Sequence, residues 1–260
     1  MSVYTNLKLE KRGHIAVVTL YNPPAHTWTQ ESLRALQRLV GDLAVDRQVY
    51  SLVLTGEGQR FFSAGADLKL FAKGDKAMAR DMAHCFGEAF ETLARFRGVS
   101  IAAINSYAMG GGLECAMACD VRIAEEHAVL ALPEPKVGLL PCGGGTQMLS
   151  WLIGEGWAKR MILCGERVDA ATAHRIGLVQ EVVPQGQALD KALDLAARVA
   201  EQSPISVAFC KQLIHEARHR PLMEGLAFER EAFVNLFGTQ DQREGVQAFL
   251  EKRLPVWNDA

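Results

Sequence analysis

Residues 101–118 read IAAINSYAMGGGLECAMA: a short apolar run, three consecutive glycines and a second apolar run. Residues 101–104 have the length and composition of a buried β-strand. The glycines allow a tight turn from a strand into a helix, and Glu114 lies in the first turn of that helix. The segment therefore predicts a strand, a glycine turn and a helix whose first amides point out of the turn.

On both sides of this segment, short β-type runs alternate with helical patterns up to about residue 185. Further strands are expected at residues 15–20, 52–55, 121–124 and 129–132. Helices are expected after a cap at Thr27 or Thr29, over residues 78–96, and from Asp169 to Gly177. A loop rich in proline and glycine is expected over residues 133–145. This alternation is typical of an α/β fold with largely parallel strands.

Beyond Pro184 the sequence shows helical patterns only. They cover residues 187–202, 204–218, 222–237 and 241–252. Ser203 and Pro204 form a helix cap followed by proline at the first helical position. We therefore predict an α/β core over residues 1–197 and a helical C-terminal region over residues 198–260.

The composition is that of an ordinary globular protein, with 260 residues, 49% hydrophobic and 22% charged. A net charge of -2 gives no basic footprint for nucleic acid. Six cysteines without a C-x-x-C pair predict reduced thiols in a cytoplasmic protein. The N-terminus lacks the features of a signal or transit peptide. No run approaches the ~18 apolar residues of a membrane span.

Two glutamates lie twenty positions apart, and the residues around each of them restrict the backbone. Glu114 follows the glycines in an apolar stretch, where an unpaired carboxylate is costly. Glu134 lies between Pro133 and Pro135. Each has a simpler interpretation: Glu114 as a helix-dipole partner worth roughly 0.3–1 kcal/mol, and Glu134 as a surface turn residue. Together, two rigid carboxyls at one apolar pocket would suit acid–base chemistry on a C=C bond.

Two segments can supply backbone N–H donors to a ligand. Small residues within positions 61–69 allow a ligand to approach the backbone, and the glycine turn exposes amides that attract negative charge. Two such amides on one carbonyl oxygen form an oxyanion hole, in which each donor contributes about 3–4 kcal/mol. The alternative is a tight strand–helix turn that binds nothing.

The chain resembles the crotonase (enoyl-CoA hydratase/isomerase) superfamily over essentially its whole length. The matching stretches are FSAGADLK at 62–69, AINSYAMGGGLE at 103–114, ACDVRIA at 118–124, Pro133-Glu134, GGTQ at 144–147, AHRIGLV at 173–179 and EGVQAFLEKR at 244–253. The resemblance implies an α/β fold of the ClpP/crotonase type, a spiral of ββα units. It also implies a helical C-terminal region that forms trimers, often as a dimer of trimers.

The resemblance further implies acyl-coenzyme A thioesters as ligands, and no other cofactor or metal. The N–H groups of Ala66 and Gly111 would hold the thioester oxygen. Positions that would contact coenzyme A are Ala64, Ala66, Asp67, Leu68, Lys69, Gly111, Phe233 and Lys252. The last two lie in the C-terminal helices and could act from a neighbouring subunit.

Glu114 and Glu134 occupy both catalytic carboxylate positions of the hydratase branch. We therefore predict a hydro-lyase that adds water across the C2=C3 bond of a 2-enoyl-CoA, with Glu114 activating water and Glu134 donating a proton. Family members with one such glutamate tend to be isomerases, so isomerisation through the same oxyanion hole is the alternative. A binding protein that has lost turnover is a third possibility, against which both intact glutamates argue.

The sequence departs from the family pattern around the acyl side of the site. The departures are Ser106, Ala131, Pro135, Cys142 (for glycine) and Met148. They leave the acyl group open, and with it the choice among fatty-acid, amino-acid and terpenoid or aromatic breakdown. Trp28 and residues 25–27 are candidates for the ligand channel, with core packing the favoured interpretation of Trp28.

One motif points to different chemistry. His215, Glu216 and His219 match the H-E-x-x-H pattern of zinc peptidases. Arg218 would place positive charge beside the metal, and Pro221 ends the helix just after the second histidine. We therefore favour a surface helix end over a zinc site.

Overall fold

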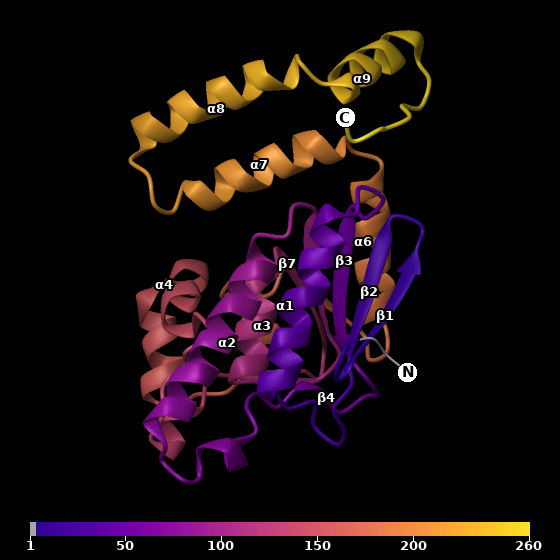
Figure 1. Ribbon diagram of the computed structural model, residues 1–260. Helices are drawn as coiled ribbons and strands as arrows, with labels where there is room; N and C mark the ends of the chain where they lie inside the picture. The colour runs from indigo at the N-terminus through magenta and orange to yellow at the C-terminus, as the bar shows by residue number, and fades with distance from the viewer. Residues whose placement is uncertain (1–3) are drawn as a thin grey trace.

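The computed structural model describes residues 4–260, and its core is built on two sheets (Figure 1). The larger sheet has the strand order β1-β2-β3-β5-β7-β10. Its strands are β1 (Leu7–Arg12), β2 (Ile15–Leu20), β3 (Ser51–Gly56), β5 (Val99–Ile104), β7 (Val121–Glu125) and β10 (Glu181–Val183). The β1–β2 pair is antiparallel, and all other pairs in this sheet are parallel. The predicted α/β class with largely parallel pairing is confirmed.

A smaller sheet has the order β4-β6-β8-β9. Its strands are β4 (Phe61–Ser63), β6 (Tyr107–Met109), β8 (Val129–Ala131) and β9 (Val168–Asp169). The pairs β4–β6 and β6–β8 are parallel, whereas β9 runs antiparallel to β8. A long strand, a short strand and a helix follow one another as β3-β4-α2, β5-β6-α3 and β7-β8-α4. This repeat is the predicted ββα unit.

The core helices are α1 (Gln30–Val45), α2 (Lys76–Ala94), α3 (Gly111–Ala118), α4 (Gly145–Leu163), α5 (Ala170–Arg175) and α6 (Ala188–Ala200). Helix α6 packs against one face of the larger sheet, and α1, α2 and α3 lie toward the other. Side chains alternate along β5, so Ala102 and Ile104 join the core with α1 and α2, whereas Ile101 and Ala103 pack against α6. Thr29 caps α1, whose apolar face is buried. The predicted boundary at residue 197/198 falls in the last turn of α6.

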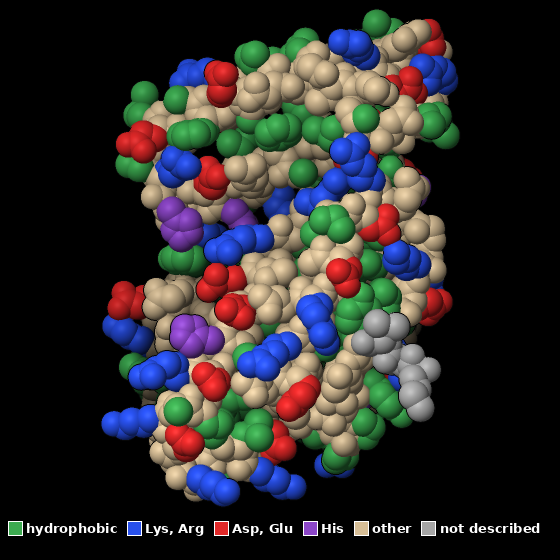
Figure 2. Space-filling model, in the orientation of Figure 1, with side chains coloured by type: hydrophobic (Ala, Val, Ile, Leu, Met, Phe, Trp, Pro, Cys, Tyr) green, Lys and Arg blue, Asp and Glu red, His purple; other side chains and the backbone are tan. Residues whose placement is uncertain are grey.

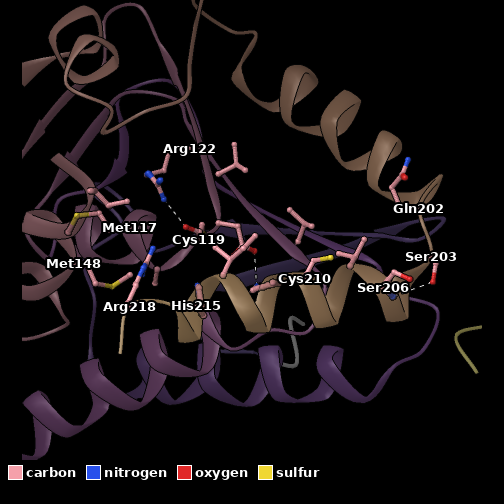
Figure 3. A pocket seen from close by; sticks show the side chains of 18 of the residues that line it. Met117, Cys119, Arg122, Met148, Gln202, Ser203, Ser206, Cys210, His215 and Arg218 are labelled. Carbon is pink, nitrogen blue, oxygen red and sulfur yellow. Dashed lines mark hydrogen bonds and ion pairs between the residues drawn. The ribbon is translucent and has the colours of Figure 1, made fainter. Parts of the chain in front are cut away.

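The C-terminal helices α7 (Pro204–Glu216), α8 (Leu222–Leu236) and α9 (Gln240–Glu251) lie beside the core (Figure 1). Many apolar side chains of this part are exposed (Figure 2), among them Leu222, Met223, Phe228, Phe233, Phe237, Phe249, Leu250 and Leu254. Lys211 ties α7 to the core, with its Nζ 2.7 Å from Oδ2 of Asp120. Next to this contact, a cavity of about 710 Å³ lies between α7 and the core (Figure 3).

Several elements were not predicted from the sequence. They are the strands β1, β4, β6, β9 and β10, the helix α4, and the short turns η1 (Leu68–Phe71) and η2 (Glu134–Val137), of which η2 lies inside the predicted loop. Helix α7 ends at Glu216, so His219 lies in the turn after it, where its ring packs edge-on against Trp151 at 5.4 Å. The two histidines of the H-E-x-x-H match therefore do not share one helix. No helix among residues 4–260 is long and apolar enough to cross a bilayer.

Candidate active site

Three neighbouring parallel strands bring the predicted site residues together. Ala66 follows β4, Glu114 follows β6, and Glu134 follows β8. The carboxyl ends of adjacent parallel strands meet at one edge of a sheet, which is a common position for ligand sites. A pocket of about 510 Å³ opens there, and both glutamates line it. The carboxyl groups therefore face one cavity, although twenty residues separate them in the sequence.

The carboxyl group of Glu114 is held by the first residue of α4 and by the loop before it. The side chain is buried, and its Oε1 accepts the N–H groups of Gly143 and Gly145, each at 2.8 Å. A Cβ atom at residue 145 would lie 2.9 Å from Oε1, and one at residue 143 would lie 3.0 Å from Oε2 and 2.7 Å from the Phe90 ring. Only glycine fits at either position. The sequence reasoning noted the glycines but missed their role as donors to Glu114.

Glu134 is held differently. It is the first residue of η2, after Pro133, and is partly buried. Its Oε2 has no hydrogen-bond partner among the described residues. Gly110 faces the carboxyl group, since a Cβ there would lie 2.8 Å from Oε1. Glu134 therefore presents an unpartnered oxygen, whereas Glu114 is fixed by two donors.

Burial shifts the pKa of both carboxyls upward. Burial has the largest effect on Glu114, whose pKa is raised to about 7. The charge of Glu134 also raises this pKa, whereas the amides of Gly145 and Gly143 lower it. Burial also raises the pKa of Glu134, partly opposed by a hydrogen bond from its own backbone. Amide donors stabilise a carboxylate relative to the neutral acid. The site can therefore hold one proton near neutral pH, and the two amides on Oε1 favour the ionised form of Glu114 against the effect of burial.

Two backbone amides border the same pocket. Gly111 is the first residue of α3, so its N–H has no partner within the helix. The N–H of Ala66 takes part in no backbone hydrogen bond of residues 4–260. Gly65, at φ +89°, lets the two segments meet, because a Cβ there would lie 2.7 Å from the Met109 carbonyl oxygen and 3.2 Å from the Gly111 nitrogen. Ala66 and Gly111 thus provide two amides for an acceptor in the pocket.

Comparison with known proteins agrees with this geometry. The sequence model of the enoyl-CoA hydratase/isomerase family matches residues 10–260. The chain belongs to this family. It is 37% identical to the short-chain-enoyl-CoA hydratase of Clostridium acetobutylicum, covering 95% of each chain. It is also 37% identical to the 2,3-dehydroadipyl-CoA hydratase of Escherichia coli, over 96% of this chain and 98% of that protein.

Solved structures support the same assignment. The structure of Pseudomonas aeruginosa DspI is 62% identical to this chain, with a TM-score of 0.97, over 99% of this chain and 98% of that one. An enoyl-CoA hydratase from Bacillus anthracis is 35% identical with a TM-score of 0.95, over 98% of this chain and all of that one. The predicted superfamily, its fold and its enzymatic hydro-lyase character are confirmed.

Only some of the residues expected to contact coenzyme A lie at the pocket of a single chain. Ala64, Ala66, Asp67, Leu68 and Gly111 line the pocket. Lys69 is exposed on the single turn η1 (Leu68–Phe71), outside the pocket lining. Phe233 on α8 and Lys252 after α9 belong to the helical part on the other side of the core from β4 (Figure 1).

The wall behind the amides is aromatic. Trp28 is buried and packs edge-on against Phe90, with ring centroids 5.7 Å apart. Phe86 packs edge-on against Phe90, with ring centroids 5.6 Å apart. A Cβ at Gly111 would lie 2.7 Å from the Phe86 ring. Trp28 is thus a core residue, as favoured from the sequence, and Thr27 is the member of its loop that lines the pocket.

Proposed function

We propose that this protein adds water across the C2=C3 bond of a 2-enoyl-CoA thioester and forms a 3-hydroxyacyl-CoA. One observation carries the proposal: two carboxyls border a single pocket with two amides that have no backbone partner among residues 4–260. Relatives named as hydratases, at similar length, support it.

The amides of Ala66 and Gly111 would bind the thioester oxygen. Attack at C3 pushes the electrons of the C=C bond toward the carbonyl, so negative charge develops on that oxygen. Donors aimed at a developing oxyanion contribute about 3–4 kcal/mol each to transition-state stabilisation. Without this stabilisation, the C=C bond is a poor acceptor for water.

The two carboxyls would divide the proton transfers. Ionised Glu114, oriented by Gly143 and Gly145, accepts a proton from water while the water oxygen bonds to C3. Protonated Glu134 donates its proton to C2, where the C=C electron pair arrives through the enolate. Glu114 ends neutral and Glu134 ends ionised, so a proton must return between turnovers. The unequal number of donors on the two carboxyls supports this division.

Coenzyme A would lie along Ala64, Ala66, Asp67, Leu68, Lys69 and Gly111. We further propose a homotrimer or a dimer of trimers, in which Phe233 and Lys252 of a neighbouring subunit complete the binding site. The exposed apolar side chains of α8 and α9 support association. No further cofactor is required by this chemistry. Six free cysteines support a cytoplasmic setting.

Isomerisation of a 3-enoyl-CoA would use the same amides but needs only one carboxyl to move a proton. It leaves the hydrogen-bonded arrangement of Glu114 without a role, so hydration is the better-supported function. Incubation with crotonyl-CoA should remove the conjugated C=C absorbance. A 3-enoyl-CoA converted to the 2-enoyl form, together with no loss of crotonyl-CoA, would favour the isomerase. Turnover of neither substrate across a range of acyl lengths would favour a binding role.

A further inference from the structure

Cys142 is an exposed residue whose position borders the pocket of the two carboxyls. It lies between the buried residues Pro141 and Gly143, and the next amide along the chain holds Glu114 at 2.8 Å. Cys142 lines the same pocket as Glu114 and Glu134. A glycine at this position would leave the space of the CH₂–SH group open to substrate.

The thiol at this position acts as a small neutral group. Desolvation, together with the charges of Glu114 and Glu134, raises its pKa to about 11. A thiolate would attack C3 of an enoyl thioester in competition with water, whereas the neutral thiol is a weak nucleophile. Desolvation and the nearby carboxyl groups therefore keep Cys142 protonated.

The proposed reaction fixes which part of the substrate meets this residue. The thioester oxygen is placed by the amides of Ala66 and Gly111, C2 by Glu134, and C3 by the water on Glu114. These three contacts fix the plane of the conjugated enoyl group. C3 then faces the part of the pocket wall that lies next to the carboxyl groups. A substituent on C3 would lie against Cys142.

We propose that Cys142 determines specificity at C3, because its side chain occupies the space that a second C3 substituent would need. The enzyme would thus favour thioesters with one substituent on C3, such as crotonyl-CoA, over 3-methylcrotonyl-CoA. This inference rests on the proposed function, since hydration is what places C3 between the carboxyls. Rejection of one extra methyl-sized group by a shaped pocket changes kcat/KM by roughly 10- to 200-fold.

The test compares kcat/KM for crotonyl-CoA and 3-methylcrotonyl-CoA in the wild type and in Cys142→Gly, Cys142→Ala and Cys142→Ser. Relative activity on the branched substrate should rise about tenfold or more in Cys142→Gly and by less in Cys142→Ala. It should stay within about twofold in Cys142→Ser, which keeps a group of similar size. Cys210→Ala changes an exposed thiol outside this pocket and should leave the ratio unchanged.

Calorimetric binding of butyryl-CoA and 3-methylbutyryl-CoA gives a second measurement that needs no turnover. The affinity ratio should move toward the branched ligand in Cys142→Gly, parallel to the kinetic ratio. Unchanged ratios in both Cys142→Gly and Cys142→Ala would overturn the inference, as would an equal change in Cys142→Ser. A wild-type enzyme that hydrates neither thioester would count against hydration itself, and the binding ratio would then decide the role of Cys142.

Discussion

Replacing Gly145 by alanine should impair the enzyme by displacing the carboxyl group of Glu114. The new Cβ would lie 2.9 Å from Oε1 of Glu114, 2.7 Å from Pro141 Cβ and 3.0 Å from a Leu132 methyl group, so the carboxyl group must move. Such a movement lengthens the two 2.8 Å hydrogen bonds from the amides of residues 143 and 145. Hydrogen bonds to charged groups contribute about 1.5–3 kcal/mol each.

Loss of about 3 kcal/mol at the transition state corresponds to a fall in kcat/KM of roughly two orders of magnitude. The pH dependence should change as well. The two amides lower the pKa of Glu114 against the effect of burial, so weaker bonds place that pKa above its present value of about 7. Because Glu114 would act as the ionised base, the acid limb of the kcat/KM profile should move to higher pH in Gly145→Ala.

Spectrophotometric assay of crotonyl-CoA between about pH 5 and pH 9 spans the transition expected from a pKa near neutrality. Gly156→Ala is the matched control, because residue 156 lies on the same helix α4 and no atom lies within 4 Å of a Cβ added there. Wild-type activity in Gly145→Ala, with an unshifted acid limb, would show that the two amides do not control the ionisation of Glu114.

Three further results are expected. In the wild type, kcat/KM should rise with pH as Glu114 ionises near pH 7; a profile without this acid limb would contradict its role as the base. Lys211→Met removes a partly buried partner of Asp120 and should lower the free energy of unfolding by about 2 kcal/mol, measured by urea titration. An unchanged free energy of unfolding would show that this ion pair does not stabilise the fold. Phe233→Asp, at a 62% exposed position, should shift the sedimentation coefficient toward the monomer and raise KM; an unchanged oligomer would exclude this face from the interface.

The parts of the fold predicted from the sequence are those with a clear repeat or cap. Helix α1 has a cap at Thr29 and a regular apolar face, and β5 is a continuous apolar run. Helix α4 escaped prediction because its apolar residues are spread around the helix axis and Gly154, at φ +78°, interrupts it. The edge strand β1 has mostly charged, exposed residues, so only its pairing with β2 defines it.

The candidate site was predicted in its residue types but not in its arrangement. Nothing local in the sequence shows that β6 and β8 are neighbours, which is what places Glu134 beside Gly110 and near Glu114. The amides that fix Glu114 come from residues 143 and 145, and long-range contacts of this kind leave no periodic signal. The family resemblance supplied the pairing of the glutamates, and the structure supplies the physical reason for their different environments.

In the proposed mechanism, two carboxyls in one pocket divide the proton transfers that add water to a thioester-conjugated double bond. Single-turnover hydration of crotonyl-CoA by Glu114→Gln and Glu134→Gln tests it most directly, because glutamine keeps the shape of each side chain but removes its acid–base function. Each variant should lose about two to four orders of magnitude in rate. A near-wild-type rate in either variant would contradict the account.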